Sequence, residues 1–337
     1  MIDVGELGTL GAGLVRPECV VCHVSGLAIV PDWTPPGGVT LLTPDGSVTR
    51  LLATAPDVDV PTPLRPNGVA LEDGGTLLLA HLGDDRGGVY RLHGDGRCEA
   101  VVTEIAATPL PPTNFVMVDA DGRLWITVST RAIPRSDDFH PDAAGGLIAV
   151  HERGETRIVA DGLGYANECV LSPDGATLYV NETFGRRLSA FDLRDGMLCE
   201  RRTVTTFGAG VFPDGVALAA DGTAVVTSIL SNRVIQVNLE TGGQTLWLAD
   251  SDEAYLSEIE EAFQSRTLAR AHLATPPPGP LSHVSSLAFA GADLSTAYLG
   301  TLGGDRLYHF TAPVAGLATP HWTRDLGPLS ALAGLST

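Results

Sequence analysis

Six polar residues stand where apolar segments of the chain begin, and together they could bind a cation. These residues are Glu18, Asn67, Asn114, Asn167, Asp214 and Ser285. Two carboxylates and three carboxamides offer oxygen ligands, which suit a hard cation such as Ca²⁺, and the carboxylates would offset its charge. Asn67 and Asp214 precede glycine and could instead form turns. Glu18 and Asn114 do not precede glycine, and the recurrence of all six positions favours a shared site.

The segments after these residues form a repeat that could bring distant residues together. In each unit a polar residue opens an apolar run, an Asp-Gly pair such as Asp73-Gly74 follows, and a second apolar run such as Leu77-Leu-Leu-Ala comes next. Asp-Gly between β-like runs predicts a hairpin. Six units with a period of about 50 residues predict an all-β fold, a six-bladed β-propeller forming one domain over residues 1–337. The first strand of each blade lines the central channel, so the six polar residues should meet at one mouth.

The last interval between repeats is longer than the others, and its surplus lies at about residues 250–280. Apolar residues recur there at helical spacing, and Thr275-Pro-Pro-Pro-Gly-Pro then stops the helix. The spaced residues are Ala254, Leu256, Ile259, Ala262, Phe263 and Leu268. We therefore expect a helical insertion before the last blade. It could be a lid over one mouth or a helix packed on the outer edge of the ring.

The composition excludes several kinds of chemistry. The 337 residues carry a formal net charge of −19 and contain no lysine. A lysine Schiff base, a pyridoxal-phosphate lysine and a Walker P-loop are therefore ruled out. An acidic chain is also poorly suited to neutralise the phosphates of a nucleic acid. Cations and small molecules are the expected partners, and the sequence does not indicate an oligomeric state.

Location is predicted from the amino terminus, the hydropathy and the cysteines. Met1 to Leu14 lacks the basic and apolar regions of a secretory signal, and no run approaches the roughly 18 apolar residues of a membrane span. A cytoplasmic protein that does not enter a membrane is expected. Five cysteines, an odd number, suit reduced thiols. Cys19 and Cys22 form a lone Cys-x-x-Cys, and on a strand their side chains would face opposite sides, which disfavours a shared metal.

Three segments carry a resemblance to a known family. They are Arg16-Pro-Glu-Cys, Asn167-Glu-Cys-Val-Leu-Ser-Pro-Asp-Gly and Phe212-Pro-Asp-Gly-Val-Ala-Leu. With them, nearly the whole chain resembles the SMP-30/gluconolactonase/LRE group of six-bladed propellers, which is distantly related to diisopropylfluorophosphatase and the paraoxonases. The resemblance implies metal ligation by Glu18, Asn167 and Asp214, with Asn114 near the metal or the substrate. Ca²⁺ is the expected metal, and Mg²⁺, Mn²⁺ and Zn²⁺ are other candidates.

The chain departs from this group where a sugar lactone would bind. Gluconolactonase-like members have Arg-x-Asn-Asp at the fourth position, whereas this chain has Pro112-Thr113-Asn114-Phe115. The missing arginine makes the site less suited to a sugar lactone. Arg131 could supply a fork for a substrate carboxylate. Alternatively, Arg131 is an exposed loop residue that pairs with Asp137 or Asp138.

These residues and the resemblance predict a calcium-dependent hydrolase. The favoured activity is that of a lactonase, in which the metal polarises the ester carbonyl of a small lactone and water attacks it. Asp214 would be a metal ligand that also positions or deprotonates the water, or attacks directly, and His283 would shuttle a proton. Substrate contacts are expected from Asn114, Arg131, Asn67 and His81. Two alternatives stay open. One is a phosphotriesterase or another ester or epoxide hydrolase at the same metal site, and the other is a non-catalytic binding propeller with a structural metal.

Overall fold

Short apolar segments form antiparallel strands in the computed structural model of the protein, which describes residues 1–335. The Asp-Gly pairs lie at the turns. Between two strands, Asp119 accepts hydrogen bonds from the main-chain nitrogens of Asp121 and Arg123, both at 2.9 Å. Gly122 has φ of +81° in this turn, a left-handed conformation that favours glycine. The last two residues of the predicted 1–337 domain lie outside the described residues.

Six of the seven sheets in the described chain form the blades, and the four main strands of each blade run in chain order from the centre of the ring outward, apart from one exchanged outer strand. The innermost strands are β2 (Val21–Cys22), β7 (Pro66–Leu71), β13 (Thr113–Val118), β17 (Ala166–Leu171), β21 (Pro213–Leu218) and β25 (Val284–Ala290). The second strands are β3 (Ala28–Asp32), β8 (Leu77–His81), β14 (Leu124–Val128), β18 (Thr177–Glu182), β22 (Thr223–Ser228) and β26 (Thr296–Thr301). The third strands are β4 (Gly38–Leu42), β9 (Val89–Leu92), β15 (Gly146–Glu152), β19 (Arg187–Arg194), β23 (Arg233–Asn238) and β27 (Leu307–Thr311).

The outermost strands complete the blades. They are β5 (Val48–Leu52), β10 (Arg97–Val102), β16 (Glu155–Leu163), β20 (Met197–Thr206), β24 (Gln244–Ala249) and, in the sixth blade, β1 (Gly8–Leu10). The short strand β6 (Ala55–Pro56) pairs with β10 in parallel, and β11 (Glu104–Ile105) and β12 (Thr108–Pro109) form a separate hairpin. Two 3-10 helices, η1 (Val4–Glu6) and η2 (Arg135–Asp138), lie outside the sheets.

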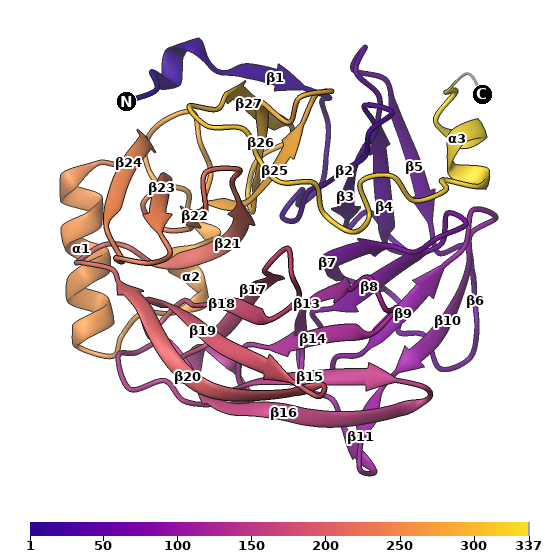
Figure 1. Cartoon of the computed structure of the whole chain (residues 1–337), viewed down its shortest axis with the longest axis horizontal. Helices are drawn as coiled ribbons and strands as arrows, with labels where there is room; N and C mark the ends of the chain where they lie inside the picture. Colours follow the sequence, from indigo (N-terminus) through magenta and orange to yellow (C-terminus); the bar gives the residue numbers. More distant parts are fainter. Residues whose placement is uncertain (336–337) are drawn as a thin grey trace.

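Each innermost strand packs against those of the two neighbouring blades, so the six sheets close into a ring (Figure 1). The prediction of an all-β six-bladed propeller is confirmed. The core lies between neighbouring blades: Leu78 belongs to a cluster with Ile126 of the third blade, and Leu79 to a cluster with Leu41 of the first. Adjacent residues on β8 thus face opposite sides, and both are buried. This explains why the strands are nearly continuous apolar runs.

The sixth blade is closed by the amino terminus, which the sequence pattern did not reveal. Strand β1 pairs with β27, with Gly8 opposite His309 and Leu10 opposite Leu307. The outer strand of the last blade thus comes from the start of the chain. This exchange ties the two ends of the ring together.

The C-terminal segment crosses the mouth of the channel at which the innermost strands end. Its main chain bonds to the fifth blade through Leu317 N and Leu218 O, and to the first blade through Val24 N and Trp322 O, both at 2.9 Å. Arg324 donates to the carbonyl oxygens of Leu71 and Asp119, in the second and third blades. Figure 1 shows the segment running across the middle of the ring toward α3 (Pro328–Leu332).

The insertion contains two helices, α1 (Glu253–Gln264) and α2 (Arg270–Ala274), where one was predicted. Helix α1 ends early because Arg266 has a left-handed φ of +60°, and the main-chain nitrogens of Thr267 and Leu268 then turn back to Ala262 O. Figure 1 shows α1 beside the fifth blade.

The insertion packs on the face of the ring at which the innermost strands begin. Ile259, Ala262 and Phe263 of α1 join an apolar cluster with residues from several loops on that face. The loop residues are Phe139, Ala143, Tyr165, Phe184, Phe212, Ile229, Leu230 and Leu302. Arg270 of α2 lies 3.2 Å from Asp84 of the second blade, which is opposite the fifth in a six-bladed ring. Figure 1 thus shows α1 at the outer edge of the ring, whereas α2 contacts the second blade on the face at which the innermost strands begin.

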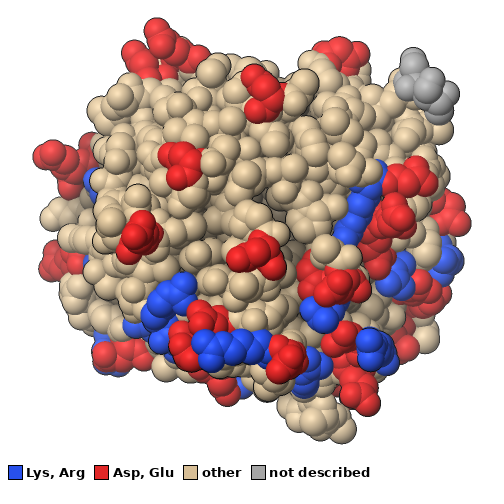
Figure 2. Space-filling view, viewed as in Figure 1, with Lys and Arg blue, Asp and Glu red and all other residues tan. Residues whose placement is uncertain are grey.

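The charged side chains on the viewed face are interleaved. In Figure 2 the arginines lie along the lower and right-hand edges among acidic residues. Within residues 1–335, no helix is long and apolar enough to cross a membrane. In the same part of the chain all five cysteines are free thiols, and Cys19 and Cys22 pack in different core clusters.

Candidate functional site

Five of the six predicted polar residues occupy the same place in their blades. Asn67, Asn114, Asn167, Asp214 and Ser285 are each the second residue of an innermost strand, rather than the residue before it. In every case the register with the second strand shifts at this point. A bulge interrupts the alternation of side chains and can re-aim one of them. All five residues are buried, as is Glu18, which lies three residues before β2.

Hydrogen bonds between neighbouring blades fix the main chain around these residues. The Asn67 amide donates to Asn114 O at 3.1 Å, and the Ser285 hydroxyl donates to Glu18 O at 2.8 Å. Asn181 of β18 donates to the carbonyl oxygen of Asp214 at 3.1 Å. Thr227 of β22 donates to Ser285 O at 2.7 Å. The geometry of the mouth therefore depends on the closure of the ring.

Several side-chain oxygens in this mouth are buried and lack a hydrogen-bond partner within residues 1–335. They are Glu18 Oε2, Asn67 Oδ1, Asn114 Oδ1 and Asp214 Oδ2. Buried polar atoms without partners are rare in folded proteins and call for an explanation. Oxygen atoms from two carboxylates and two carboxamides are the donor set that a hard cation takes, so these residues fit a metal ion. No group of three or more His, Cys, Asp or Glu in the described chain is arranged to hold one, so the amide oxygens would be essential.

The carboxylates of the mouth repel one another. Burial, Glu18 and Glu168 raise the pKa of Asp214 well above its ordinary range, and Arg16 and a hydrogen bond from Asn167 act in the opposite direction. The Asn167 amide also donates to Thr183 Oγ1 at 3.0 Å. A divalent cation among these groups would favour their ionised forms.

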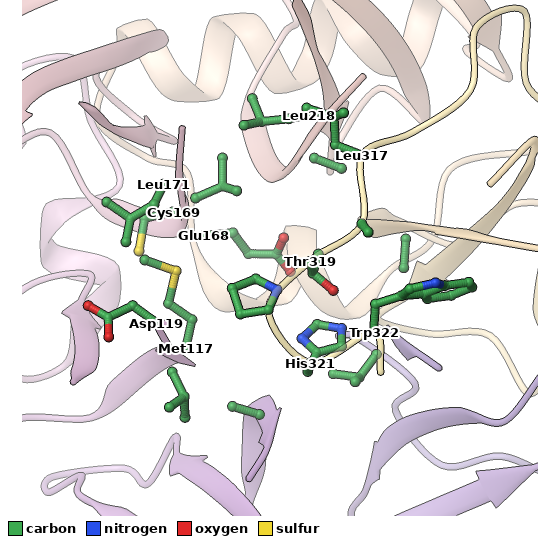
Figure 3. Close-up of a pocket in the computed structure, with 18 of the residues that line it drawn as sticks. Met117, Asp119, Glu168, Cys169, Leu171, Leu218, Leu317, Thr319, His321 and Trp322 are labelled. Carbon is green, nitrogen blue, oxygen red and sulfur yellow. The ribbon is translucent and has the colours of Figure 1, made fainter. Parts of the chain in front are cut away.

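Glu168 lines a cavity of about 700 Å³ inside the channel, between this mouth and the C-terminal segment. Figure 3 shows its side chain pointing into the cavity, which His321 and Trp322 of the C-terminal segment line on another side. Glu168 Oε2 accepts a hydrogen bond from Val216 N at 3.2 Å, and burial raises the pKa of Glu168 to about 8. The carboxylate of Glu182 on β18 is also buried, but it is paired with Arg187 at 2.7 Å and with Arg201 at 2.6 Å.

The two histidines that the sequence singled out are both buried near the mouth. His283 Nδ1 lies 3.2 Å from Ile229 O, and its Nε2 lies 3.0 Å from Thr275 O in the insertion. Burial lowers the pKa of His283. Both ring nitrogens thus face main-chain carbonyls, but the neutral ring that the lowered pKa favours has one N–H and can donate to only one of them. His81 accepts a hydrogen bond at Nδ1 from Arg65 N at 3.0 Å, and burial lowers its pKa to about 4.

Arg131 does not join the other candidate residues. Its Nη1 and Nη2 lie 2.6 and 2.8 Å from the two carboxylate oxygens of Asp161, on the outermost strand β16 of its blade. The fork that could hold a substrate carboxylate is therefore occupied. The partner is Asp161 rather than Asp137 or Asp138.

Arg16 is a further residue of the mouth, and it belongs to the Arg16-Pro-Glu-Cys segment that also contains Glu18. Its Nη2 lies 2.8 Å from Glu18 Oε2, although the two are not aligned as a hydrogen bond. The guanidinium carbon is 4.3 Å from the ring centroid of Trp33. The only sequence signal was its position two residues before Glu18.

Comparison with known proteins places the chain in a group with the same architecture. The family model of the SMP-30/Gluconolactonase/LRE-like region matches residues 66–248. A gluconolactonase from Xanthomonas campestris is 21% identical with a TM-score of 0.63, over 92% of this chain and 90% of that one. Regucalcin, a calcium-binding protein from Agrobacterium tumefaciens, is 16% identical with a TM-score of 0.63, over 94% of this chain and 97% of that one. A luciferin-regenerating enzyme is 16% identical with a TM-score of 0.64, over 96% of this chain and 98% of that one. At these identities the three structures show the shared fold.

Proposed function

The chain belongs to the SMP-30/gluconolactonase/LRE-like family, and from this membership and the geometry of its channel mouth we propose that it is a calcium-dependent lactonase. The observation that carries the proposal is the cluster of buried oxygens on Glu18, Asn114 and Asp214 that lack partners in the described chain. Arg16 lies 2.8 Å from Glu18 Oε2, but Asp214 has no ion-pair partner among the described residues, and burying such a carboxylate costs several kcal/mol. A cation held by these oxygens would offset that cost.

Glu18, Asn114, Asn167 and Asp214 would hold the metal. Their oxygens suit Ca²⁺, and regucalcin, a calcium-binding protein, has the same fold. When bound, Ca²⁺ would act as a Lewis acid that polarises the ester carbonyl and stabilises negative charge on its oxygen.

Asp214 would position the attacking water and accept its proton. Its main chain is held by Asn181 of the neighbouring strand, so the carboxylate has a defined place. General-base assistance of this kind accelerates a reaction by about 10² to 10⁴. Asn67 and Asn114 would orient the substrate, and His81 would contact it through Nε2, because Nδ1 already accepts from Arg65.

The insertion would restrict the substrate to a small molecule. It lies over the mouth and is tied to blades on opposite sides of the ring. Closing a site in this way excludes water and strengthens its electrostatic interactions.

Acid release from substrate panels tests the proposal. We expect chelator-treated protein to hydrolyse γ- and δ-lactones only after Ca²⁺ is restored. A phosphotriester and an epoxide should give a lower kcat/KM than the lactones. Calcium binding without turnover of any panel member would instead indicate a binding propeller. Full lactone turnover in excess chelator would remove the metal from the proposal.

A further inference from the structure

Two arginines converge on one aromatic ring beside the candidate metal site. The guanidinium carbons of Arg16 and Arg65 lie 4.3 and 5.7 Å from the ring centroid of Trp33. Trp33 is itself fixed, because its Nε1 donates to the carbonyl oxygen of Pro66 at 2.6 Å. Pro66 directly precedes Asn67 of the mouth. A guanidinium stacked on an anchored indole keeps a defined plane.

The two arginines differ in how their donors are used. Arg65 Nη1 donates a hydrogen bond to Asp84 Oδ2 at 2.8 Å. Arg16 Nε is buried and has no hydrogen-bond partner in the part of the chain that the structure describes. The Arg16 guanidinium approaches Glu18 Oε2 at 2.8 Å, but that contact is not aligned as a hydrogen bond. Buried donors without acceptors cost about 1–3 kcal/mol, so Arg16 is set up for an acceptor that the chain itself does not supply.

The charge of Arg16 acts across the mouth. It opposes the rise in the pKa of Asp214 and contributes to the low pKa of His283. Both residues belong to other blades, the fifth and the sixth. An anion bound by Arg16 would therefore lie within electrostatic reach of the carboxylate that is proposed to activate water.

We propose that Arg16, held on Trp33, binds a carboxylate of the substrate, so that the substrate is a lactone with a carboxylate close to its ester. The inference rests on the proposed lactonase function and names the substrate class of the same site. If Glu18 is a metal ligand, its carboxylate is committed to the cation, and the planar fork of Arg16 is left for a second carboxylate. Two parallel N–H···O bonds make such a pair strong and directional. Arg16 takes the role that the sequence suggested for Arg131.

Kinetics on a matched pair of lactones tests the assignment. The pair is γ-butyrolactone and the same ring with a carboxylate on the carbon next to the ring oxygen. Arg16→Gln should raise KM for the carboxylated lactone at least about tenfold more than KM for γ-butyrolactone, which reports any effect of the variant on Glu18 and Asp214. Arg16→Lys keeps the charge without the fork and should recover only part of the loss. Arg194→Gln is the matched control, because Arg194 is exposed at the end of β19. Equal effects of Arg16→Gln on both lactones would overturn the assignment.

Equilibrium binding separates this inference from the lactonase proposal. Calorimetric titration of the Ca²⁺-loaded protein with glutarate should give a Kd that Arg16→Gln weakens about tenfold or more. The calcium-dependent shift in melting temperature of the variant is measured in parallel to confirm that the metal site is retained. Arg16-dependent glutarate binding without hydrolysis of any lactone would support the anion site and reject the lactonase. Equal affinity in both proteins, no glutarate binding by the wild type, or tighter binding of inorganic phosphate than of glutarate would overturn the carboxylate assignment.

Discussion

Glu260 on α1 accepts hydrogen bonds from both terminal nitrogens of Arg186, with Nη1 3.1 Å from Oε1 and Nη2 2.6 Å from Oε2. The same guanidinium lies 4.1 Å from the ring centroid of Phe263 and 4.4 Å from that of Phe212. Phe263 belongs to the insertion and Phe212 to the fifth blade. A single arginine of the fourth blade therefore joins the insertion to the ring by ion pairing and by stacking.

Replacing Glu260 should loosen the insertion. Glu260→Gln removes the bidentate pair and weakens the bond from Gly210 N, now 2.9 Å from Oε2. Because the pair is partly buried, we expect a loss of about 1–2 kcal/mol in the free energy of unfolding, measured with urea. Glu258→Gln on the exposed side of α1 is the control and should change stability by less than about 0.5 kcal/mol. Equal losses in the two variants would argue against a specific tie.

The same pair should make stability depend on acid pH. Burial opposes ionisation of Glu260, but the bonds from Arg186 prevail and lower its pKa from 4.5 to about 2. A carboxylate with a lowered pKa contributes stability that is complete above its unfolded pKa and is lost as pH falls toward the folded value. The stability difference between wild type and Glu260→Gln should therefore be constant above about pH 5 and shrink between pH 4.5 and 2. A difference that stays constant through pH 3 would contradict this assignment of charge.

Calcium should stabilise the fold through the mouth residues. A ligand at about 100 times its Kd adds roughly 2.7 kcal/mol, so chelator-stripped protein should melt several degrees higher in Ca²⁺. Mg²⁺ and Zn²⁺ are the comparison cations. Glu18→Gln should abolish most of the shift, because it removes one of the two carboxylates. If no cation shifts the melting temperature of protein shown by elemental analysis to be stripped, the metal site is rejected.

Asp214→Asn should separate catalysis from folding. At saturating Ca²⁺ we expect kcat for a lactone to fall by about 10² to 10⁴. The metal-free melting temperature should not fall, because the variant lacks a buried carboxylate whose pKa is raised by burial and by Glu18. Asp57→Asn, in an exposed loop, is the control. Unchanged kcat would exclude Asp214 as the base.

Much of the ring could be predicted because its signal is local. A polar residue, an apolar strand and an Asp-Gly turn recur together, so positions such as Asn67 and Asp214 are identified within one repeat. Contacts between blades have no such signal. Asn181 and Thr227 look like ordinary strand residues, yet they bond to the main chain of the neighbouring blade. Strand β1 is only three residues long and pairs with a strand near the other end of the chain.

The directions of individual side chains were harder to predict than the strands. The bulge between Ala166 and Cys169 breaks the two-residue alternation, so the sequence did not indicate that Glu168 points into the channel. For Arg131 the sequence left two interpretations open, a fork for a substrate carboxylate or an exposed loop residue paired with Asp137 or Asp138. Its position relative to Asp161 depends on the pairing of β14, β15 and β16, which a single repeat does not specify.

His283 should contribute more to stability than to turnover. Its ring joins the fifth blade to the insertion through the carbonyl oxygens of Ile229 and Thr275, and its φ is +60°. Asparagine tolerates this left-handed conformation better than most residues but is too short to reproduce both contacts. We therefore expect His283→Asn to lower the free energy of unfolding by about 1–3 kcal/mol and to leave kcat of the folded fraction within a few fold. A loss of 10² or more in kcat at wild-type stability, with the alkaline or acidic limb of the pH profile removed, would instead establish His283 as the proton shuttle.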